Sequence, residues 1–331
     1  MFRNGRLAGV VAAIALLLVG CGNATVGSPA QQAANVAQES SSAPQGNASI
    51  LQQRSTEGTV YPLTVTDGLG RAVQIAHPPQ TIVSLAPSNT EILYALGLGD
   101  RVAGVDAFSD YPPQAKQKPK VGDMNPNIEA IVSLHPDLVI GFSPSQRTAA
   151  EKLQQAHIPT LLYNPQTIDQ VFQEITQIGQ VAGIPSRADR VVQQLRQRLN
   201  AVQQRVSTLG STQRVRVLIL TDTKERYTGG KGTLYDEVIQ RAGGINTAAS
   251  GNGWYALSKE QLLIQNPHVI VLTGGSASDL QNDPSLASVV AVKERRIVTS
   301  IDPNLLSRAG PRLIDGVELL AKTLYPNLFP R

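Results

Sequence analysis

NIEAIVSLHPDLVI, residues 127–140, has a pattern that recurs in the chain as SKEQLLIQNPHVIV, residues 258–271. Each copy opens on a residue type that caps helices, places a glutamate two residues later, and reaches a proline seven residues after that glutamate. The proline stops the helix, and the apolar, β-branched run after it is typical of a buried strand. The repeat therefore predicts a capped helix and a buried strand at two places, with Glu129 and Glu260 in matching positions.

Strands and helices alternate in two blocks, one on each side of a long polar stretch. Short β-branched runs bounded by turn residues indicate strands, and apolar residues at helical spacing indicate helices. Such alternation is typical of α/β folds with a mostly parallel sheet, so we predict two Rossmann-like α/β lobes joined by a long α-helix. Besides the repeat, the expected strands are residues 82–85, 102–107, 160–163, 215–220 and 296–299, and the expected helices are residues 88–96, 148–156, 234–241 and 311–324.

The polar stretch between the blocks carries apolar residues at helical spacing, from residue 168 to 182 and again from residue 187 to 209. GIPS at residues 183–186 interrupts it, because proline cannot continue a helix and Ser186 is a residue type that caps a new one. We therefore expect a long, interrupted helical bridge between the lobes.

A further capping pattern marks the first helix of the first block. SNTE at residues 88–91 has the spacing of a capping box, in which the serine hydroxyl and the glutamate carboxylate accept hydrogen bonds from free amides at the helix start. This pattern assigns Glu91 a structural role at that helix start.

The N-terminus carries the features of an export signal. Arg3 and Arg6 precede an apolar run, residues 7–19, that is shorter than the roughly 20 residues needed to span a membrane. The run ends at LVGC, residues 18–21, which resembles a bacterial lipobox, where the cysteine accepts a diacylglyceryl group and the chain is cleaved just before it. We predict that Cys21 is lipidated; the alternative is a cysteine that packs as a small apolar side chain.

The segment after this cysteine is rich in Ala, Gln, Ser, Asn and Gly, a composition that cannot offset the entropy cost of ordering the chain. We therefore predict a disordered tether ahead of the folded lobes. The expected organisation is a signal peptide at residues 1–20, a tether at 21–59, an N-terminal lobe at 60–166, a bridging helix at 167–210 and a C-terminal lobe at 211–331.

Charge and cysteine content exclude several classes of protein. The chain has 29 basic and 25 acidic residues, and loss of Arg3 and Arg6 with the signal leaves 27 basic residues against the same 25 acidic ones. With basic and acidic residues so nearly balanced, we expect no basic surface for binding nucleic acid. Because Cys21 is the only cysteine, we expect no internal disulfide and no thiolate metal site in the mature domain.

The sequence lacks the common signatures of enzymes. TGGKGT at residues 228–233 resembles a phosphate loop, but Gly232 separates its lysine from its threonine, and Glu225 stands where that motif needs its first glycine. No serine lies in the nucleophile-elbow pattern. We therefore predict a protein that is not an enzyme, with a two-lobed extracytoplasmic enzyme as the alternative. The histidines are scattered singly, so no shared metal site is expected; they are His77, His135, His157 and His268.

Aromatic residues indicate where a ligand binds. They make up only 4% of the chain, yet Phe108, Phe142, Tyr227 and Trp254 fall in loops near the ends of strands. In an open parallel sheet the carboxyl ends of the strands face the ligand crevice. Ordinary loop packing is the alternative for each aromatic alone, but the four together indicate a large, flat and partly apolar ligand.

Five short motifs, spread over both blocks, carry a resemblance to a known family. They are SLAPSNTE at residues 84–91, FSDYPP at 108–113, NIEAI at 127–131, PDLVI at 136–140 and RAGPR at 308–312. They look like the substrate-binding proteins of ATP-driven cobalamin and iron-siderophore importers, and their spacing is closest to the cobalamin-binding members. The resemblance runs from about Val65 to the C-terminus and implies two α/β lobes bridged by a long helix.

The resemblance implies that the four aromatic residues stack on the ligand. Phe108, Phe142 and Trp254 stand at positions that are aromatic in the cobalamin binders, and Tyr227 stands near such a position. The chain departs from the family pattern just before the first repeat. The family has a tryptophan there, which this sequence lacks, and Met124 is the apolar residue in that segment.

The resemblance also implies roles for four polar residues. Asp302 and Arg308 match a polar pair of the last loop that hydrogen-bonds the ligand, although two extra residues separate them here. Glu129 and Glu260 match the two glutamates, one from each lobe, that form salt bridges with arginines of the membrane permease. The alternative for both glutamates is a helix-start carboxylate that stabilises its own helix by about 0.3–1 kcal/mol without any partner.

These features together predict a monomeric, lipid-anchored protein of the cell envelope, on the extracytoplasmic side. It is expected to bind a cobalamin-like corrinoid between its lobes and to deliver it to the permease of an ABC importer, without cofactor, metal or nucleic acid.

The alternative ligand is a ferric siderophore or haem. Lys224, Arg226 and Lys231 flank Tyr227 and would neutralise an anionic chelate, and Tyr227 or Tyr255 would act as an iron ligand.

Overall fold

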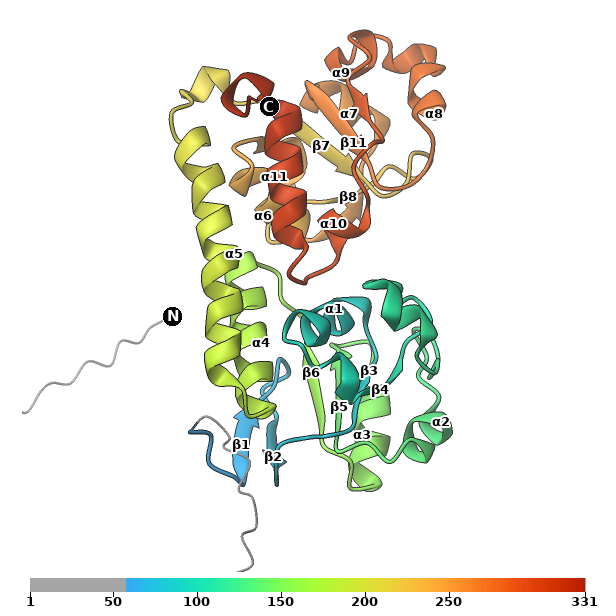
Figure 1. The fold of residues 1–331 in the computed structure, drawn as a ribbon. Coiled ribbons are helices and arrows are strands. Elements are labelled where there is room, and N and C mark those ends of the chain that lie inside the picture. The colour runs from blue at the N-terminus through green and yellow to red at the C-terminus, as the bar shows by residue number, and fades with distance from the viewer. Residues whose placement is uncertain (1–57, 331) are drawn as a thin grey trace, which may run out of the picture. The chain divides into compact units, whose positions relative to one another are not determined.

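Two α/β lobes connected by the long helix α5 (Pro185–Val206) make up residues 58–330, the residues that the computed structural model describes (Figure 1). A four-stranded sheet forms the centre of the N-terminal lobe, and a six-stranded sheet forms the centre of the C-terminal lobe. The predicted fold class is confirmed. The predicted signal peptide, Cys21 and nearly all of the predicted tether lie outside the described residues. Within the described part of the chain, no helix is long and apolar enough to cross a membrane.

The N-terminal lobe is built on a fully parallel sheet. Its strands are β3 (Ile82–Ser84), β4 (Val102–Val105), β5 (Leu138–Phe142) and β6 (Thr160–Tyr163), and its helices are α1 (Pro87–Ala95), α2 (Ile128–Ser133), α3 (Arg147–Gln155) and α4 (Ile168–Val181). The strand order is β4-β3-β5-β6, and every residue of β3 and β6 is buried. Side chains of α1 and α4 pack on one face of this sheet and side chains of α2 and α3 on the other, as a parallel sheet requires.

The C-terminal lobe has a mixed sheet. Its strands are β7 (Arg216–Leu220), β8 (Tyr227–Gly229), β9 (Ile245–Asn246), β10 (Trp254–Ala256), β11 (Val269–Leu272) and β12 (Ile297–Val298). Strands β12, β11, β7 and β9 are parallel to one another. Strand β8 is antiparallel to β7 on one side and to the edge strand β10 on the other. Its helices are α6 (Leu234–Arg241), α7 (Lys259–Gln265), α8 (Ala277–Gln281), α9 (Val290–Lys293), α10 (Asn304–Ser307) and α11 (Leu313–Leu324). The short strands β8, β9 and β10 were not predicted.

The sequence repeat has the same local structure in both lobes. Asn127 caps α2 by accepting a 2.9 Å hydrogen bond from the amide of Ala130, and Ser258 caps α7 by accepting a 3.1 Å bond from the amide of Gln261. The residue before each proline, His135 or Asn266, has a positive φ. The predicted capped helices and the buried strands β5 and β11 are therefore confirmed, and the equivalence extends to the backbone turn between them.

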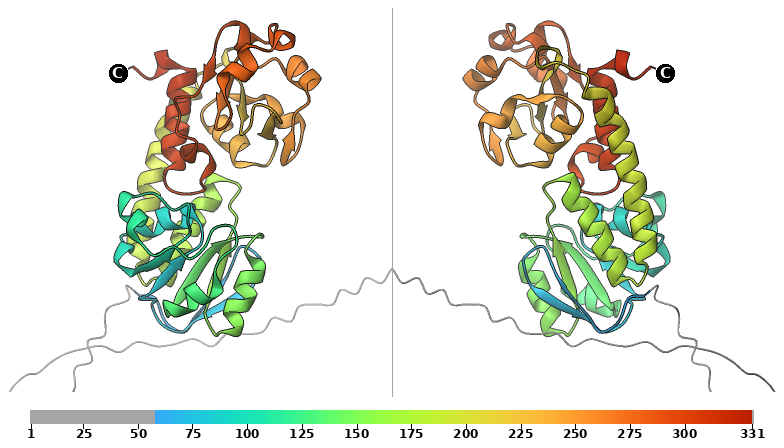
Figure 2. Two further views of the ribbon diagram at one scale, coloured as in Figure 1. Left: turned by 90° about the vertical axis from the view of Figure 1, so that its right-hand side faces the viewer. Right: turned by 90° about the vertical axis from the view of Figure 1, so that its left-hand side faces the viewer.

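The helical stretch between the lobes is a hairpin of two helices. Helices α4 and α5 lie side by side, and only α5 continues to the C-terminal lobe (Figures 1 and 2). At 22 residues, α5 is about 33 Å long. The predicted cap at Ser186 is wrong, since Ile184 is the capping position and Pro185 occupies the first helical turn. Proline suits that turn because its missing amide would have no helical partner there.

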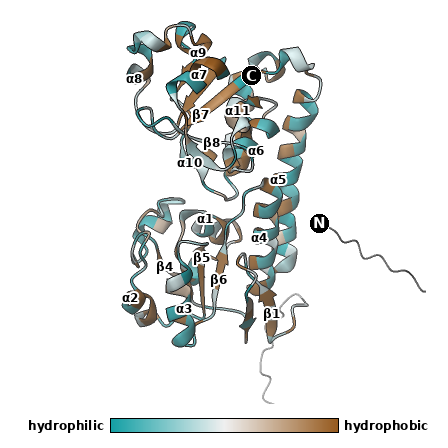
Figure 3. Cartoon of the chain, turned by 180° about the vertical axis from the view of Figure 1, so that it is seen from behind, coloured by the Kyte–Doolittle hydropathy of each residue, from teal (hydrophilic) through white to brown (hydrophobic). Residues whose placement is uncertain are grey.

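One hydrophobic core runs through both lobes and the helical hairpin. Phe172 of α4 packs with Ile82 and Ile140 of the N-terminal sheet, while Leu199 of α5 and Val317 of α11 belong to the same cluster as the C-terminal strands. Figure 3 shows strands β5 and β7 in brown, whereas α5 is mainly teal because only one stripe of it faces this core. The lobes are thus joined by packed side chains as well as by the chain itself.

Helix α4 buries a carboxyl group in this core. Glu174 is 3% exposed, and neither of its carboxyl oxygens has a hydrogen-bond partner within residues 58–330. Burial raises the pKa of Glu174 well above its ordinary value, because a charged carboxylate is poorly solvated there. Tyr163 and Asp67 line the same small cavity, and Asp67 is already paired with Arg71 at 2.6 Å.

We predict that Glu174→Gln removes a pH dependence of stability. A carboxyl with a raised folded-state pKa binds more protons in the folded chain, so the free energy of unfolding falls as the pH rises from about 4.5 toward that raised pKa. The amide does not titrate, so the variant should lose this slope and be the more stable protein at neutral pH. Urea unfolding over this pH range measures the effect, with the exposed Glu151→Gln as the control. Parallel curves for wild type and Glu174→Gln would contradict the prediction.

Candidate ligand-binding site

A cleft of about 510 Å³ lies between the two lobes. Its N-terminal side consists of the residues that follow β3, β4, β5 and β6, so the carboxyl ends of all four parallel strands open onto it. Its C-terminal side consists of Leu234 at the start of α6, Trp254 in β10, and residues 307–309 after α10. Ligand sites with largely apolar walls and a few polar groups commonly have this size.

The structure brings four of the six predicted ligand residues together in this cleft. Phe108, Phe142, Trp254 and Arg308 all line it. Trp254 is 41% exposed and Phe108 is 55% exposed, so both present ring surface to a ligand. Tyr227 and Asp302 are not among the lining residues.

Trp254 is held between two tyrosine rings. The buried Tyr235 meets it edge-on, with ring centroids 4.8 Å apart, and its hydroxyl is hydrogen-bonded to that of Thr273 at 2.8 Å. Burial raises the pKa of Tyr235 to about 12. Tyr227 lies nearly parallel to Trp254, with centroids 6.3 Å apart. Tyr227 therefore stacks on the tryptophan and does not itself line the cleft, and its contact with the ligand stays a prediction.

Phe108 stands on a loop fixed by Asp106, a residue that the sequence analysis did not single out. Asp106 is buried at the end of β4, and its carboxylate accepts hydrogen bonds from the Ser109 hydroxyl and, at 2.9 Å, from the amide of Phe108. Burial raises the pKa of Asp106, while these hydrogen bonds and the Lys120 charge oppose the rise. The predicted strand, residues 102–107, includes Asp106, whereas the observed β4 ends at Val105 and leaves Asp106 directly after it.

Phe142 is the last residue of β5, and the buried Gln146 side chain fixes the backbone there. The Gln146 amide group accepts a 2.7 Å bond from the Phe142 amide and donates a 2.8 Å bond to the carbonyl of Leu85. Met124, which the sequence offers in place of a family tryptophan, also lines the cleft and is 56% exposed. Phe108, in the loop after β4, and Phe142, at the end of β5, therefore both stand on backbone that a buried side chain fixes by hydrogen bonds.

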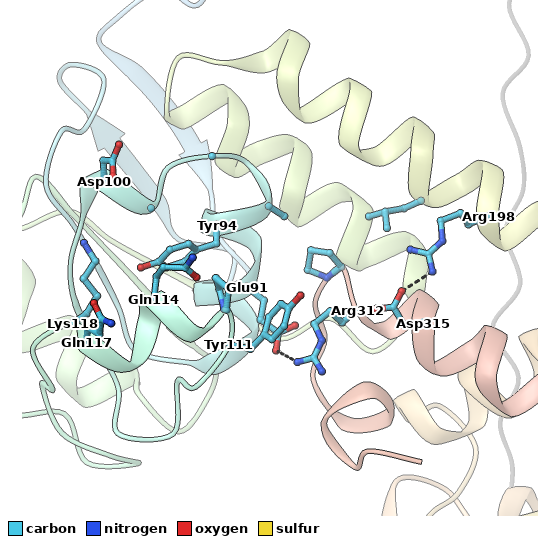
Figure 4. Close-up of a pocket in the computed structure, with 16 residues that line it drawn as sticks. Glu91, Tyr94, Asp100, Tyr111, Gln114, Gln117, Lys118, Arg198, Arg312 and Asp315 are labelled. Atoms are coloured by element: carbon cyan, nitrogen blue, oxygen red, sulfur yellow. Dashed lines mark hydrogen bonds and ion pairs between the residues drawn. The ribbon is translucent and has the colours of Figure 1, made fainter. Parts of the chain in front are cut away.

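An ion-pair cluster connects the lobes at this cleft. Arg308 donates hydrogen bonds to Glu91 at 3.1 Å, to Asp110 at 2.7 Å and to the carbonyl of Phe108 at 3.3 Å. Arg312 contacts the same Glu91 oxygen at 3.2 Å (Figure 4). Two arginines of the C-terminal lobe thus meet one buried carboxylate of the N-terminal lobe.

The capping-box assignment of Glu91 is therefore wrong. Ala86 is the capping position of α1, and no side chain caps this helix. The Glu91 side chain is only 1% exposed, and a buried carboxylate needs charged partners, which Arg308 and Arg312 supply. Burial raises the pKa of Glu91, and the two arginines oppose that rise.

Asp302, the second polar residue predicted to bind the ligand, lies outside the lining of the cleft. Asp302 contacts Arg312 at 3.1 Å, and Arg312 also lies 3.9 Å from the centre of the Tyr111 ring. Arg312, Tyr111 and Glu91 line a second cavity, of about 850 Å³, that borders α5 and α11 and is shown in Figure 4. None of the predicted ligand residues lines that larger cavity, so the smaller cleft is the candidate site.

The two repeat glutamates occupy the same position in their helices. Glu129 and Glu260 are each the second residue of a capped helix, one in each lobe, and both are exposed. Among the described residues neither forms an ion pair, whereas the neighbouring Lys259 contacts Asp283 at 2.8 Å. Hydrogen bonds from the helix-start backbone and from Ser258 lower the pKa of Glu260. Their role in docking stays a prediction.

The residues proposed for an anionic chelate do not line the cleft. Arg226 donates to the carbonyls of Leu257 and Lys224, both at 2.9 Å. The Tyr255 hydroxyl donates to the carbonyl of Ala248 at 2.8 Å. Within residues 58–330, no group of three or more His, Cys, Asp or Glu side chains is arranged to hold a metal ion.

Two α/β lobes, a stiff helical connection and an aromatic cleft between the lobes define a class, the two-lobed solute-binding proteins. The chain belongs to the periplasmic binding protein family, whose profile matches residues 82–303. This match confirms the family resemblance found in the sequence. Because members of this family are transport components, it also confirms the prediction that the chain is not an enzyme.

Three known proteins show what the chain is similar to. An uncharacterized ABC transporter substrate-binding lipoprotein, YvrC of Bacillus subtilis, is 37% identical over 97% of this chain and 98% of its own length. The structure of the vitamin B12-binding protein BtuF of Vibrio cholerae is 30% identical, with a TM-score of 0.65 over 76% of this chain and 99% of its own. The haem-binding protein RhuT of Roseiflexus is 31% identical, with a TM-score of 0.67 over 75% of this chain and 99% of its own.

We predict that Glu91→Ala destabilises the protein by about 2–3 kcal/mol, because it leaves two largely buried guanidinium groups without their shared carboxylate. Asp169→Asn is the matched control: Asp169 also pairs with two arginines, Arg196 and Arg241, but is half exposed and should cost less than about 1 kcal/mol. Urea unfolding measures both values, and equal losses in the two variants would contradict the role given to burial.

Proposed function

We propose that this chain is a lipid-anchored, extracytoplasmic substrate-binding protein of an ABC importer, which binds a cobalamin-like corrinoid between its lobes and delivers it to the permease. The observation that carries the proposal is the cleft, where Phe108, Phe142 and Trp254 from both lobes surround one space beside Arg308. The vitamin B12-binding relative supports the choice of ligand, and the substrate-binding lipoprotein of Bacillus subtilis supports the transport role.

The cleft suits a large ligand with flat faces and an amide-rich edge. Aromatic rings from both lobes offer stacking surface, which favours an extended ring system. Asn164 and Gln166 also line the cleft and bring neutral amide groups. A corrinoid matches these features because its macrocycle is flat and its periphery carries amides.

The alternative ligand is haem or a ferric siderophore, which the haem-binding relative supports. Haem iron in proteins is held by His, Cys, Met or Tyr side chains. Of these residue types, only Met124 lines the cleft, and both tyrosines expected to bind iron lie elsewhere. A corrinoid, whose nucleotide base is its own metal ligand, does not need such a residue, so we favour it.

Docking to the permease is proposed to use Glu129 and Glu260. Their support is the repeat itself: each glutamate is exposed, stands second in a capped helix, and is without an ion-pair partner among the described residues. Charged pairs of this kind steer encounter and fix register between proteins. Lipidation at Cys21 would hold the protein near the permease by raising its concentration at the membrane.

We predict that cyanocobalamin binds the chain with a dissociation constant in the micromolar range or tighter, and that Trp254→Ala weakens binding about thirtyfold through loss of about 2 kcal/mol of ring contact. Calorimetric titration of the mature chain carrying Cys21→Ser measures this, with haem and a ferric hydroxamate as competing ligands. Ile245→Ala is the control, since Ile245 is 39% exposed, much as Trp254 is, and does not line the cleft. An affinity for cyanocobalamin no better than millimolar would overturn the corrinoid proposal.

We predict that the double variant Glu129→Lys, Glu260→Lys keeps its ligand affinity within about twofold but loses most transport. The expected cause is repulsion between the new lysines and permease arginines, which costs several kcal/mol at a protein interface. Uptake of labelled ligand by cells carrying the importer measures transport, and Glu151→Lys, an exposed glutamate of α3, is the control. Unchanged uptake in the double variant would defeat the docking assignment.

A further inference from the structure

We propose that this cleft selects ligands without net negative charge, and that Glu91 and Asp110 are the residues that set this selectivity by neutralising Arg308. The inference rests on the proposed function, since it takes the cleft between the lobes as the ligand site. It narrows the range of possible ligands from metal chelates in general to chelates that are uncharged or cationic.

The charged side chains of the cleft are mainly acidic. Arg308 is the only cationic side chain among the residues that line it, while Asp106 and Asp123 also line it. Lys120 approaches from behind, where its ammonium group donates to the carbonyl of Ser109 at 2.9 Å. An anionic ligand therefore has one guanidinium to bind, and it meets two aspartates in the same space.

Arg308 is already occupied on both of its terminal nitrogens. One nitrogen, Nη1, contacts the carboxylates of Glu91 and Asp110, and the other, Nη2, contacts the carbonyl of Phe108. The arginine side chain is only 12% exposed. Because both Nη1 contacts are to carboxylates, an anion that binds through both terminal nitrogens would require Arg308 to leave a carboxylate, and breaking such a shielded pair exposes an uncompensated buried charge.

The surrounding cluster does not supply a spare cation. Arg312 is shared between Glu91 and Asp302 and lies over the Tyr111 ring, so its guanidinium is also occupied. The cluster holds three carboxylates against two guanidinium groups. One oxygen of Glu91, Oε2, is buried and has no hydrogen-bond partner in the part of the chain that the structure describes. Among the described residues, the junction thus has a buried carboxylate oxygen without a hydrogen-bond partner, while each of its guanidinium groups is already paired with carboxylates.

A ligand with neutral amide edges suits this arrangement. It can stack on the aromatic rings and accept a weak bond from the exposed edge of Arg308 without breaking an ion pair. A chelate with free carboxylates, such as haem, or a ferric tris-catecholate, would place negative charge in the space lined by Asp106 and Asp123. Like-charge contacts of this kind at an interface are strongly unfavourable.

The test uses two ligands with the same frame and different charge: cyanocobalamin and one of its monocarboxylic acids, in which a single peripheral amide is replaced by a carboxylate. Calorimetry on the mature chain with Cys21→Ser should show the acid binding at least about tenfold more weakly. In the double variant Glu91→Gln, Asp110→Asn, Arg308 loses both charged partners, so the ratio of the two affinities should move at least about tenfold toward the acid. Both substitutions keep the side-chain shape and an acceptor oxygen, which favours folding.

A merely structural role for Glu91 and Asp110 would lower both affinities together and leave their ratio unchanged, and that result would overturn the proposal. Equal binding of acid and amide by wild type would overturn it as well. Asp315→Asn is the control, because Asp315 pairs with Arg198 and does not touch Arg308. If wild type binds neither corrinoid, the corrinoid proposal fails, and the charge proposal is then decided by ferrioxamine B, a cation, against a ferric tris-catecholate, an anion. Tighter binding of the anion would refute it.

Discussion

Glu91 is a carboxylate that cannot remain buried alone, and the junction between the lobes follows from that constraint. Its partners come from 217 and 221 residues further along the chain, so the ion pairs form only when the C-terminal lobe lies against the N-terminal one. Arg308 and Arg312 in turn fix the loop between α10 and α11, which carries one wall of the cleft. A single buried charge therefore sets the geometry of the cleft and its electrostatic balance at the same time.

The hydrophobic core imposes the same arrangement by a different means. Because α5 contributes Leu195 and Leu199 to a cluster that also contains strands of both sheets, large rotations of one lobe would expose packed apolar surface. A helix is also stiffer than an extended linker of the same length. The ligand walls are thus held in place before any ligand arrives, which lowers the cost of ordering them on binding.

Most of the fold could be predicted from the sequence, because hydrophobic periodicity is local. The strand at 160–163 and the helix at 234–241 have the predicted bounds, and both repeat units are capped as expected. The failures concern partners that local patterns cannot identify. SNTE at residues 88–91 has capping-box spacing, yet the buried Glu91 pairs with distant arginines. The surroundings of Tyr227 also depend on distant pairing, since β8 pairs with β10 and Tyr227 stacks on Trp254, while its contact with the ligand stays a prediction.

The roles proposed for docking and for ligand binding fall on different parts of the repeated unit. In both copies the helix start presents an exposed glutamate, and the residue before the proline, His135 or Asn266, has a positive φ. The cleft aromatics are placed differently, since Phe142 ends the strand that follows the first helix, whereas Trp254 lies in the strand that precedes the second. Matching helix starts fit a partner with two similar contact points, whereas a cleft for one asymmetric ligand requires its two walls to differ. The symmetric part of the unit therefore suits docking, and the part that departs from symmetry suits recognition of the ligand.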